Sequence, residues 1–345
     1  MPCPGLVKVK PHYDLYLKYS KLLQRIYKRY SDNVEPFGMD ECWISLPYDE
    51  DDAVSVAEEI RQTVKDETGL TVSIGASFSK ALAKLGSDMK KPDALTVLRK
   101  SDFKEKCWDL PVSDLLYVGP RTTKKLNNIA ITTIGQLANA PSDIIARKFG
   151  KNGLMVQAFA NGTDCSAVAP MDYSPAPKSI GHGATCTRDL EDNYSVWLAL
   201  DELAQDVSHR MIASECKTKA VHLYVKDNSF MYHEYVAPIH YPTQSAAIIA
   251  QAAYELFLLY YRWEKPVRAL TITASKLQDE EAPDQLDMFG DYLIFDKRNR
   301  LDRAIDDIRN RFGKDAIYSA CHCRRRTDLA TDKCETVKMP GVMYH

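Results

Sequence analysis

The sequence predicts an α+β protein of several domains, because successive stretches of the chain differ in the pattern of their apolar residues. Residues 1–105 mix helices with short strands, and residues 106–164 contain only short helices. Residues 178–277 follow a βαββαβ order, which implies a four-stranded sheet backed by two helices. The 345 residues are enough for two or three compact domains.

The first stretch is predicted to be an α/β unit. Apolar residues recur at helical spacing in residues 14–30 and again in residues 53–64. Gly69 follows the second of these helices, as a glycine often does just past a helix end. Residues 42–46 and 70–78 are typical of strands, and the second strand leads into a third helix.

The remaining segments are predicted to connect or extend these domains. Residues 165–177 contain three prolines and no periodicity, as expected of a linker. Residues 278–290 are polar and typical of a loop, and apolar residues at helical spacing between 301 and 312 predict a last helix. Residues 321–345 show no periodicity, so no regular structure is expected there.

Composition and charge exclude several classes of protein. No apolar run reaches the roughly 20 residues that span a bilayer, and the first ten residues have no apolar signal core. We therefore expect a cytoplasmic protein that does not engage a membrane and keeps its nine cysteines reduced. The net charge of −2 leaves nucleic-acid binding open, because basic residues can line one cleft of a neutral protein.

The carboxylate pair Asp40-Glu41 lies where a turn enters a predicted strand. Neighbours in a regular strand point to opposite faces, but the irregular backbone at a strand entrance allows both side chains to reach one metal. Mg²⁺ is typically held by one or two carboxylates together with substrate phosphates. A solvated turn is the usual role of such a pair. The apolar Phe37, Met39 and Trp43 nearby favour a functional role, since charge beside buried apolar surface needs a reason.

A basic block follows in residues 71–98, TVSIGASFSKALAKLGSDMKKPDALTVL. Its helix carries four lysines: Lys80, Lys84, Lys90 and Lys91. Lysines gathered at the end of such a unit can bind a triphosphate as point charges. The more frequent role of lysines is a solvated helix face. The prediction of a nucleotide site therefore rests on the lysines taken together with the carboxylate pair.

These two segments resemble the palm motifs of the Y-family translesion DNA polymerases. EPFGMDECWISL, residues 35–46, is similar to the family's turn and strand, and residues 71–98 resemble its strand, small-residue turn and AK helix that ends in KP. The resemblance implies that Asp40 and Glu41 bind catalytic Mg²⁺ and position the primer 3′ end. It also implies that Lys91 contacts the triphosphate of the incoming deoxynucleoside triphosphate.

The resemblance continues along the chain and implies binding of primer-template DNA. Residues 115–138 look like the helix–hairpin–helix of the thumb, whose backbone amides grip a DNA phosphate without reading sequence. Pro120 departs from the usual pattern and removes one amide. Residues 178–182, KSIGH, resemble the first DNA-facing strand of the little finger, although His182 is equally compatible with a surface histidine. The implied DNA-binding residues are Gly119, Arg121, Thr122, Ser179, Gly181, Thr185 and Arg188.

The implied organisation assigns each predicted domain to a part of a polymerase. Residues 1–105 would be a partial palm, 106–164 the thumb, 165–177 a linker and 178–277 the little finger. Residues 278–345 would hold a loop, a terminal helix and a tail. The loop contains QLDMF, which resembles the bacterial sliding-clamp-binding motif QLxLF, and the alternative is that its apolar residues fold back onto the protein. The implied clamp-binding residues are Gln285, Leu286, Met288 and Phe289.

The terminal segment contains residue types that bind zinc. Cys321, His322 and Cys323 are consecutive, and Cys334 follows. A zinc site is conceivable from these residue types, but a run this tight does not match the usual spacing of zinc ligands, which argues against one.

Two functions from different classes are compatible with these residues. The first is a DNA-directed DNA polymerase of the SOS damage response that adds nucleotides opposite damaged bases by a two-Mg²⁺ mechanism. The match starts just after the family's fingers, so the family's first metal-binding aspartate has no counterpart, and residues 1–345 alone are expected to extend primers negligibly. The second is a catalytically inactive protein that binds DNA and the sliding clamp.

Overall fold

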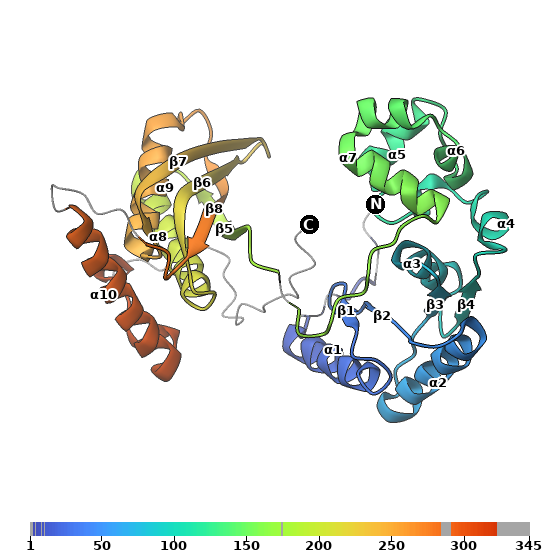
Figure 1. Cartoon of the computed structure of the whole chain (residues 1–345). Coiled ribbons are helices and arrows are strands. Elements are labelled where there is room, and N and C mark those ends of the chain that lie inside the picture. Colours follow the sequence, from blue (N-terminus) through green and yellow to red (C-terminus); the bar gives the residue numbers. More distant parts are fainter. Residues whose placement is uncertain are drawn as a thin grey trace. The chain divides into compact units, whose positions relative to one another are not determined.

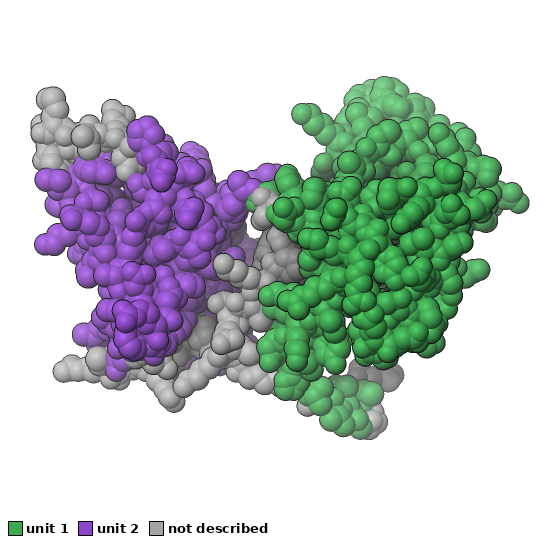
Figure 2. Space-filling view, turned by 60° about the horizontal axis from the view of Figure 1, so that its bottom comes forward, with its two compact units in different colours: residues 1–175, 336–345 green, residues 176–335 purple. Residues whose placement is uncertain are grey.

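The computed structural model describes residues 3, 5–7, 9, 11–173, 175–283 and 291–322. The chain forms two compact units, one of Met1–Pro175 with Thr336–His345 and one of Ala176–Glu335. Figure 2 shows the two units in different colours. The segment predicted to be a linker contains this boundary, and the predicted palm and thumb lie together in the first unit.

The part of the first unit that the sequence predicts to be the palm contains two small sheets packed with three helices (Figure 1). Strands β1 and β2 pair antiparallel, while β3 and β4 pair parallel and are connected by α3. The elements are α1 (Tyr13–Tyr27), β1 (Val34–Pro36), β2 (Cys42–Ile44), α2 (Glu50–Thr68), β3 (Ile74–Ser77), α3 (Lys80–Met89) and β4 (Leu95–Leu98). The sequence pattern did not reveal β1, which has only three residues and ends in a proline.

Helix α3 packs unusually close to strand β3 because two glycines face each other. A Cβ atom added to Gly75 would lie 1.9 Å from the carbonyl oxygen of Ala83, and one added to Gly86 would lie 3.3 Å from the Cα of Gly75. Ser79 caps this helix by accepting a hydrogen bond from the Leu82 amide at 3.3 Å. The glycines therefore determine the distance between α3 and the strand, and with it the position of the lysines on α3.

The segment predicted to be the thumb is helical, as expected. Its elements are α4 (Phe103–Cys107), η1 (Val112–Asp114), α5 (Pro120–Asn127), α6 (Ile134–Ala138) and α7 (Ser142–Asn161). Helix α7 consists of two helical stretches that meet at a kink at Gly150, whose φ of +63° and ψ of −150° are not helical, in agreement with the two short helices that the apolar pattern predicts there. Leu82 and Leu98 of the palm share one buried core with Phe103, Ile134 and other thumb residues, which joins the two segments.

The second unit has the predicted βαββαβ order. Its four strands form an antiparallel sheet of order β5-β8-β6-β7, and helices α8 and α9 cover one face (Figure 1). A large core of aliphatic residues, including Leu203, Val221 and Leu270, lies between the sheet and these helices. The elements are β5 (Ser179–Leu190), α8 (Asn193–Ile212), β6 (Cys216–Asp227), β7 (Tyr232–Thr243), α9 (Ala246–Tyr260), β8 (Val267–Asp279), α10 (Asp291–Phe312), η2 (Lys314–Ala316) and η3 (Ala320–His322).

Within the described ranges, no helix is long and apolar enough to cross a bilayer. The terminal helix predicted from the spacing of Leu301, Ile308 and Phe312 is present as α10, which begins earlier than that pattern indicated.

Replacement of Gly75 by alanine tests the close contact between β3 and α3. The added methyl group would overlap backbone atoms of α3 rather than a side chain that can move away. We expect Gly75→Ala to lower the stability of the first unit by about 3 kcal/mol, the upper end of typical overpacking effects. Hydrogen-exchange mass spectrometry of the full chain would show this as lost protection in α3 and β3.

The matched control is Gly119→Ala. A Cβ at Gly119 meets nothing within 4 Å, and its backbone is extended rather than left-handed. Its effect should stay below about 1 kcal/mol, the typical effect of a changed helix N-cap. Equal protection of α3 in wild type and Gly75→Ala would contradict the packing argument.

Candidate active site and nucleic-acid interface

The predicted carboxylate pair lies at the tip of the β1–β2 hairpin. The Phe37 amide donates to the carbonyl of Glu41 at 2.8 Å and closes the turn, while Gly38 adopts a φ of +95° that favours glycine. Asp40 is exposed, and among the described residues it forms no ion pair. Glu41 is half-buried. The turn thus presents two carboxylates on an irregular backbone, as the sequence predicted.

A chain of alternating charges connects Glu41 to Lys91. The Nζ atom of Lys84 lies 3.1 Å from a carboxylate oxygen of Glu41 and 2.6 Å from one of Asp88. The other carboxylate oxygen of Asp88 lies 2.7 Å from Nζ of Lys91. Helix α3 carries Lys84 and Asp88, and Lys91 follows its C-terminal end. The structure therefore brings Glu41 and Lys91, predicted from separate motifs, into one electrostatic network.

Burial and ion pairing act on these groups in opposite directions. Burial favours the neutral form of Asp88, but the Lys84 and Lys91 ammonium groups outweigh it and hold the pKa of Asp88 below its usual value. For Lys84, burial is again opposed by hydrogen bonds to Asp88 and Glu41, and its pKa is raised. Burial, and secondarily the Glu41 charge, raises the pKa of the Cys42 thiol to about 12. Cys42 is therefore neutral near pH 7.

A second ion pair fixes the base of the hairpin. Nζ of Lys80 lies 2.6 Å from a carboxylate oxygen of Glu35 and 4.5 Å from the ring centroid of Trp43. The Trp43 indole in turn donates to the Lys80 carbonyl at 2.9 Å, and the amide of Ala169 donates to Glu35 at 2.8 Å. Lys80 was grouped with the triphosphate-binding lysines by sequence. In the structure it is largely buried and links α3 to the hairpin.

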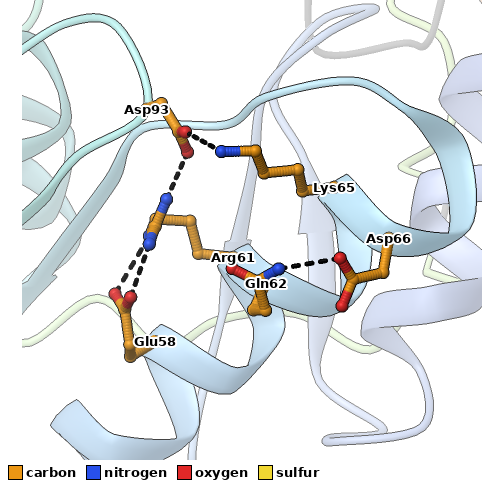
Figure 3. A network of polar contacts seen from close by, with 6 residues as sticks. All are labelled: Glu58, Arg61, Gln62, Lys65, Asp66 and Asp93. Atoms are coloured by element: carbon orange, nitrogen blue, oxygen red, sulfur yellow. Dashed lines mark hydrogen bonds and ion pairs between the residues drawn. The ribbon is translucent and has the colours of Figure 1, made fainter.

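A polar network on α2 holds the segment that follows Lys91 (Figure 3). Asp93 has a φ of +53° and accepts hydrogen bonds from Arg61 and, at 2.8 Å, from Lys65. Arg61 also forms a two-pronged contact with Glu58, the neighbour one turn away on the same helix. Hydrogen bonds from Lys65 and then Arg61 lower the pKa of the Asp93 carboxylate. The network therefore positions the backbone next to Lys91.

The predicted thumb hairpin places Gly119 and Arg121 on the surface at the start of α5, with Thr122 half-buried. Pro120 occupies the first turn of this helix. An amide at that position has no partner within a helix, so the proline removes no helical hydrogen bond. The Thr123 amide bonds to the Gly119 carbonyl at 2.9 Å, which leaves the amides of Arg121 and Thr122 as the first-turn donors.

Between α5 and α7 the thumb surface is hollowed. The hollow has a volume of about 650 Å³ and lies beside the kink of α7. Its lining includes Thr122 and Lys125 of α5 and Lys148 and Asn152 of α7. Basic and amide side chains of this kind are common contacts of nucleic-acid backbones.

Three of the predicted little-finger residues lie on the face of the sheet opposite the helices. In β5, Ser179, Gly181 and Thr185 pair with Ser275, Thr273 and Ala269 of β8, so their side chains share one face. A Cβ on Gly181 would lie 2.5 Å from the Thr273 hydroxyl, so glycine is needed for this close pairing. The resulting surface along β5 and β8 is made of small and hydroxyl-bearing residues.

The other residues that the sequence singled out lie in different environments or outside the described residues. Arg188 is exposed and follows a register shift that starts after Thr185. His182 faces the helix side, where its Nδ1 lies 2.9 Å from Asp206 of α8, so it is not a histidine of the open face. The four clamp-motif residues, Gln285, Leu286, Met288 and Phe289, lie outside the described residues.

Comparison with known proteins finds matches in both units of the chain. A model of the impB/mucB/samB family matches residues 2–88, and a model of that family's C-terminal domain matches residues 177–288. The chain is 44% identical over 314 residues to a protein of Acetivibrio thermocellus named DNA polymerase IV, a match that covers 90% of this chain and 79% of the relative. The chain belongs to the impB/mucB/samB family. This confirms the expected membership of the Y-family translesion polymerases.

Other members of the family are similar over most of their length. A DNA polymerase IV of Moorella thermoacetica is 34% identical over 321 residues, with 92% of this chain and 79% of the relative covered. Among solved structures, a Y-family DNA polymerase chimera, Dbh-Dpo4(243-245)-Dbh, matches with a TM-score of 0.68 at 16% identity, over 79% of each chain. This likeness concerns the fold, and it confirms the predicted α+β multidomain class.

Substitution of Asp93 tests the network next to Lys91. Because the folded protein lowers the pKa of Asp93, the carboxylate adds stability above its unfolded pKa of about 3.9 and loses that contribution as pH falls through the folded value. We expect Asp93→Asn to lower the melting temperature of the first unit at pH 7, and we expect this effect to shrink as the pH falls below about 3.9. Asparagine tolerates the positive φ, so backbone strain is not introduced.

Differential scanning calorimetry at several pH values would measure this difference. Asp109→Asn is the control, because Asp109 is exposed and forms no ion pair among the described residues. A difference between wild type and Asp93→Asn that persists unchanged to pH 3 would show that the ion pairs do not cause it.

Proposed function

We propose that this protein catalyses template-directed nucleotidyl transfer to a primer 3′ end opposite damaged bases. The observation that carries the proposal is the charge network of the palm, in which the carboxylate pair at the hairpin tip is linked through α3 to Lys91. Glu41, Lys84 and Asp88 of this network lie within residues 2–88, which match the family model, and relatives of this chain are named DNA polymerase IV.

Asp40 and Glu41 are proposed to hold Mg²⁺. Their oxygen atoms are the ligand type that Mg²⁺ prefers, and Asp40 is exposed without a competing ion pair in the described part of the chain. Bound Mg²⁺ would neutralise charge on the reacting phosphates and the primer oxygen. Glu41 stays oriented by Lys84, so one carboxylate is held in place while the other is free to rotate toward its ligand.

Lys91 is proposed to contact the triphosphate of the incoming deoxynucleoside triphosphate. Its side chain is half exposed, and its ion pair with Asp88 is at the surface, where such pairs contribute little to stability. A triphosphate carries more charge than Asp88 and can replace it as the partner of Lys91. The ion pair of Asp88 with Lys84 would then keep the Asp88 charge compensated.

The two DNA contacts are proposed to be independent of base sequence. Arg121 and Thr122 offer first-turn amides at the start of α5, next to the exposed Gly119, which suits a phosphate. Ser179, Gly181, Thr185 and Arg188 offer hydroxyl, backbone and guanidinium donors along β5. Contacts of this type fix the position of a duplex without reading its bases, which a polymerase that copies any template requires.

Loss of the carboxylates should abolish extension without loss of DNA binding. We expect Asp40→Asn combined with Glu41→Gln to reduce Mg²⁺-dependent primer extension by at least about 100-fold. Loss of a residue that only orients a metal ligand already costs up to about 100-fold, and loss of the ligands themselves should cost at least as much. Primer extension is measured for the chain itself and for a chimera that adds the unmatched residues of the 44%-identical relative. Fluorescence anisotropy measures binding to the same primer-template.

The control is Asp109→Asn, which also removes an exposed carboxylate of the first unit. Extension that survives in the doubly substituted protein would refute the role of Asp40 and Glu41. The second candidate function is a catalytically inactive DNA- and clamp-binding protein. It predicts that the unsubstituted and the doubly substituted protein both bind DNA and that neither extends the primer.

We further propose that the protein acts in the cytoplasm, in an SOS-type damage response, and is recruited by the bacterial sliding clamp. The proposal rests on the resemblance of QLDMF, residues 285–289, to the clamp-binding motif. Apolar anchors dominate the binding energy of such short motifs. Leu286→Ala combined with Phe289→Ala should weaken clamp binding at least tenfold in surface plasmon resonance. DNA binding without the clamp should not change, and unchanged clamp affinity would refute the assignment.

A further inference from the structure

A cluster of three possible metal ligands lies in the second unit, on the helix side of the sheet. The short helix η3 packs on α8 so that Nε2 of His322 lies 2.7 Å from a carboxylate oxygen of Asp201. Cys321 is its neighbour in the chain, and the ligand atoms of Asp201, Cys321 and His322 all lie within 4.8 Å of one another. We propose that these three side chains bind a Zn²⁺ ion.

The cluster differs from the one that the sequence indicated. Cys321 and His322 belong to the tight C-H-C run, which by itself does not have zinc spacing. Folding adds Asp201, which is far away in sequence but adjacent in space. Zinc ligands lie about 2.0–2.3 Å from the ion, so in a tetrahedral site they are roughly 3–4 Å apart. The three side chains are already close to that separation.

The ligand types select zinc over magnesium. One thiolate, one imidazole and one carboxylate form a mixed sulfur, nitrogen and oxygen set, which suits Zn²⁺, whereas Mg²⁺ prefers oxygen ligands alone. A thiolate and a carboxylate together carry two negative charges, so the Zn²⁺ complex would be neutral. A neutral complex is favoured at this position, because the side chains of Asp201 and His322 are only 13% and 14% exposed and an uncompensated charge is costly to bury.

Surrounding contacts orient the ligands without the help of a metal. Nε2 of Gln205, one turn along α8, donates to the bonded Asp201 oxygen at 2.8 Å. The hydroxyl of Tyr194 donates to the carbonyl of Cys321 at 3.1 Å. Partners of this kind fix the orientation of metal ligands and increase metal affinity.

The segment that leads to the cluster is also anchored on the second unit. Arg309 of α10 donates to the carbonyl of Ile317 at 2.8 Å, and Lys314 lies 2.8 Å from Asp206 of α8. Preorganisation of this kind lowers the entropic cost of metal binding. A bound ion would further fasten the segment after α10 to the core of the little finger.

Binding requires a defined change of protonation. The thiol of Cys321 loses its proton to solvent, and the proton that Nε2 of the neutral His322 imidazole donates to Asp201 is replaced by one on Nδ1 through exchange with solvent, so that Nε2 can bind the metal. One proton per ion is therefore released, and the hydrogen bond between His322 and Asp201 is replaced by two bonds to zinc. No oxidant or reductant takes part.

Zinc titration of the full chain tests the site. Protein stripped with a chelator and kept reduced is titrated with Zn²⁺ against a chromophoric competitor, and Co²⁺ replaces zinc for absorption spectroscopy. We expect a cobalt complex with a sulfur-to-metal charge-transfer band that Cys321→Ser abolishes. Each of Asp201→Asn, Cys321→Ser and His322→Asn should weaken zinc binding more than about tenfold. Millimolar Mg²⁺ should not displace the zinc.

The matched controls are Cys165→Ser and His240→Asn, which remove an exposed thiol of the first unit and an exposed imidazole of β7. Both should bind zinc as the unsubstituted protein does. Zinc should raise the melting temperature of the unsubstituted protein and of the controls, but not that of Asp201→Asn. This shift separates metal binding from a structural role of the His322–Asp201 hydrogen bond.

Two results would overturn the proposal. Zinc affinity that is unchanged in Asp201→Asn would mean that any bound metal is held elsewhere. No measurable zinc binding, together with a lower melting temperature of Asp201→Asn, would mean that the pair only docks η3 on α8. Neither result bears on primer extension, so the outcome is independent of the polymerase proposal.

Discussion

The close contact between Gly75 and Gly86 determines where helix α3 lies, and the palm site depends on that position. With no side chain between strand and helix, the backbone of α3 approaches β3 within the space that one methyl group would fill. Lys84 and Asp88 on this helix then reach Glu41 on one side and Lys91 on the other. A helix held farther from the strand would separate Lys84 from Glu41 of the hairpin, whereas the ion pairs of Asp88 with Lys84 and Lys91 are local to α3 and its C-terminal end. Packing of two apolar residues thus sets the electrostatics of the site.

The sheet of the second unit has two different faces, one packed in the core and one exposed. Its helix side is filled with aliphatic residues, while strands β5 and β8 show glycine, serine and threonine on the other side. Small side chains leave such a surface flat, and its hydroxyl groups are hydrogen-bond donors. Helix α8 is part of the core and also carries Asp201 and Asp206, which bind histidines from η3 and β5. One helix therefore organises both the core and the polar contacts around it.

The sequence predicted what is local and missed what depends on distant contacts. The long helices and strands of the second unit have full periods of apolar residues, and their order was correct. Strands β1 and β4 and helix α4 have only three to five residues, too few for a period to emerge. The hairpin carboxylates were visible because Asp40 and Glu41 are adjacent. The link from Glu41 to Lys84, and the approach of Asp201 to His322, involve residues far apart in the chain, and no local pattern contains that information.

The alternating order of the charges in the palm network has a consequence for binding. Glu41, Lys84, Asp88 and Lys91 form two opposite pairs, so the network is neutral before any ligand arrives. A magnesium ion or a triphosphate alone would disturb this neutrality, whereas a magnesium–triphosphate complex brings compensating charges to its two ends. Desolvating one unpaired charge costs far more than exchanging one partner for another. On the proposed function, the network would therefore favour the metal–nucleotide complex over either component, because the cation would contact the carboxylates at the hairpin while the phosphates would contact Lys91.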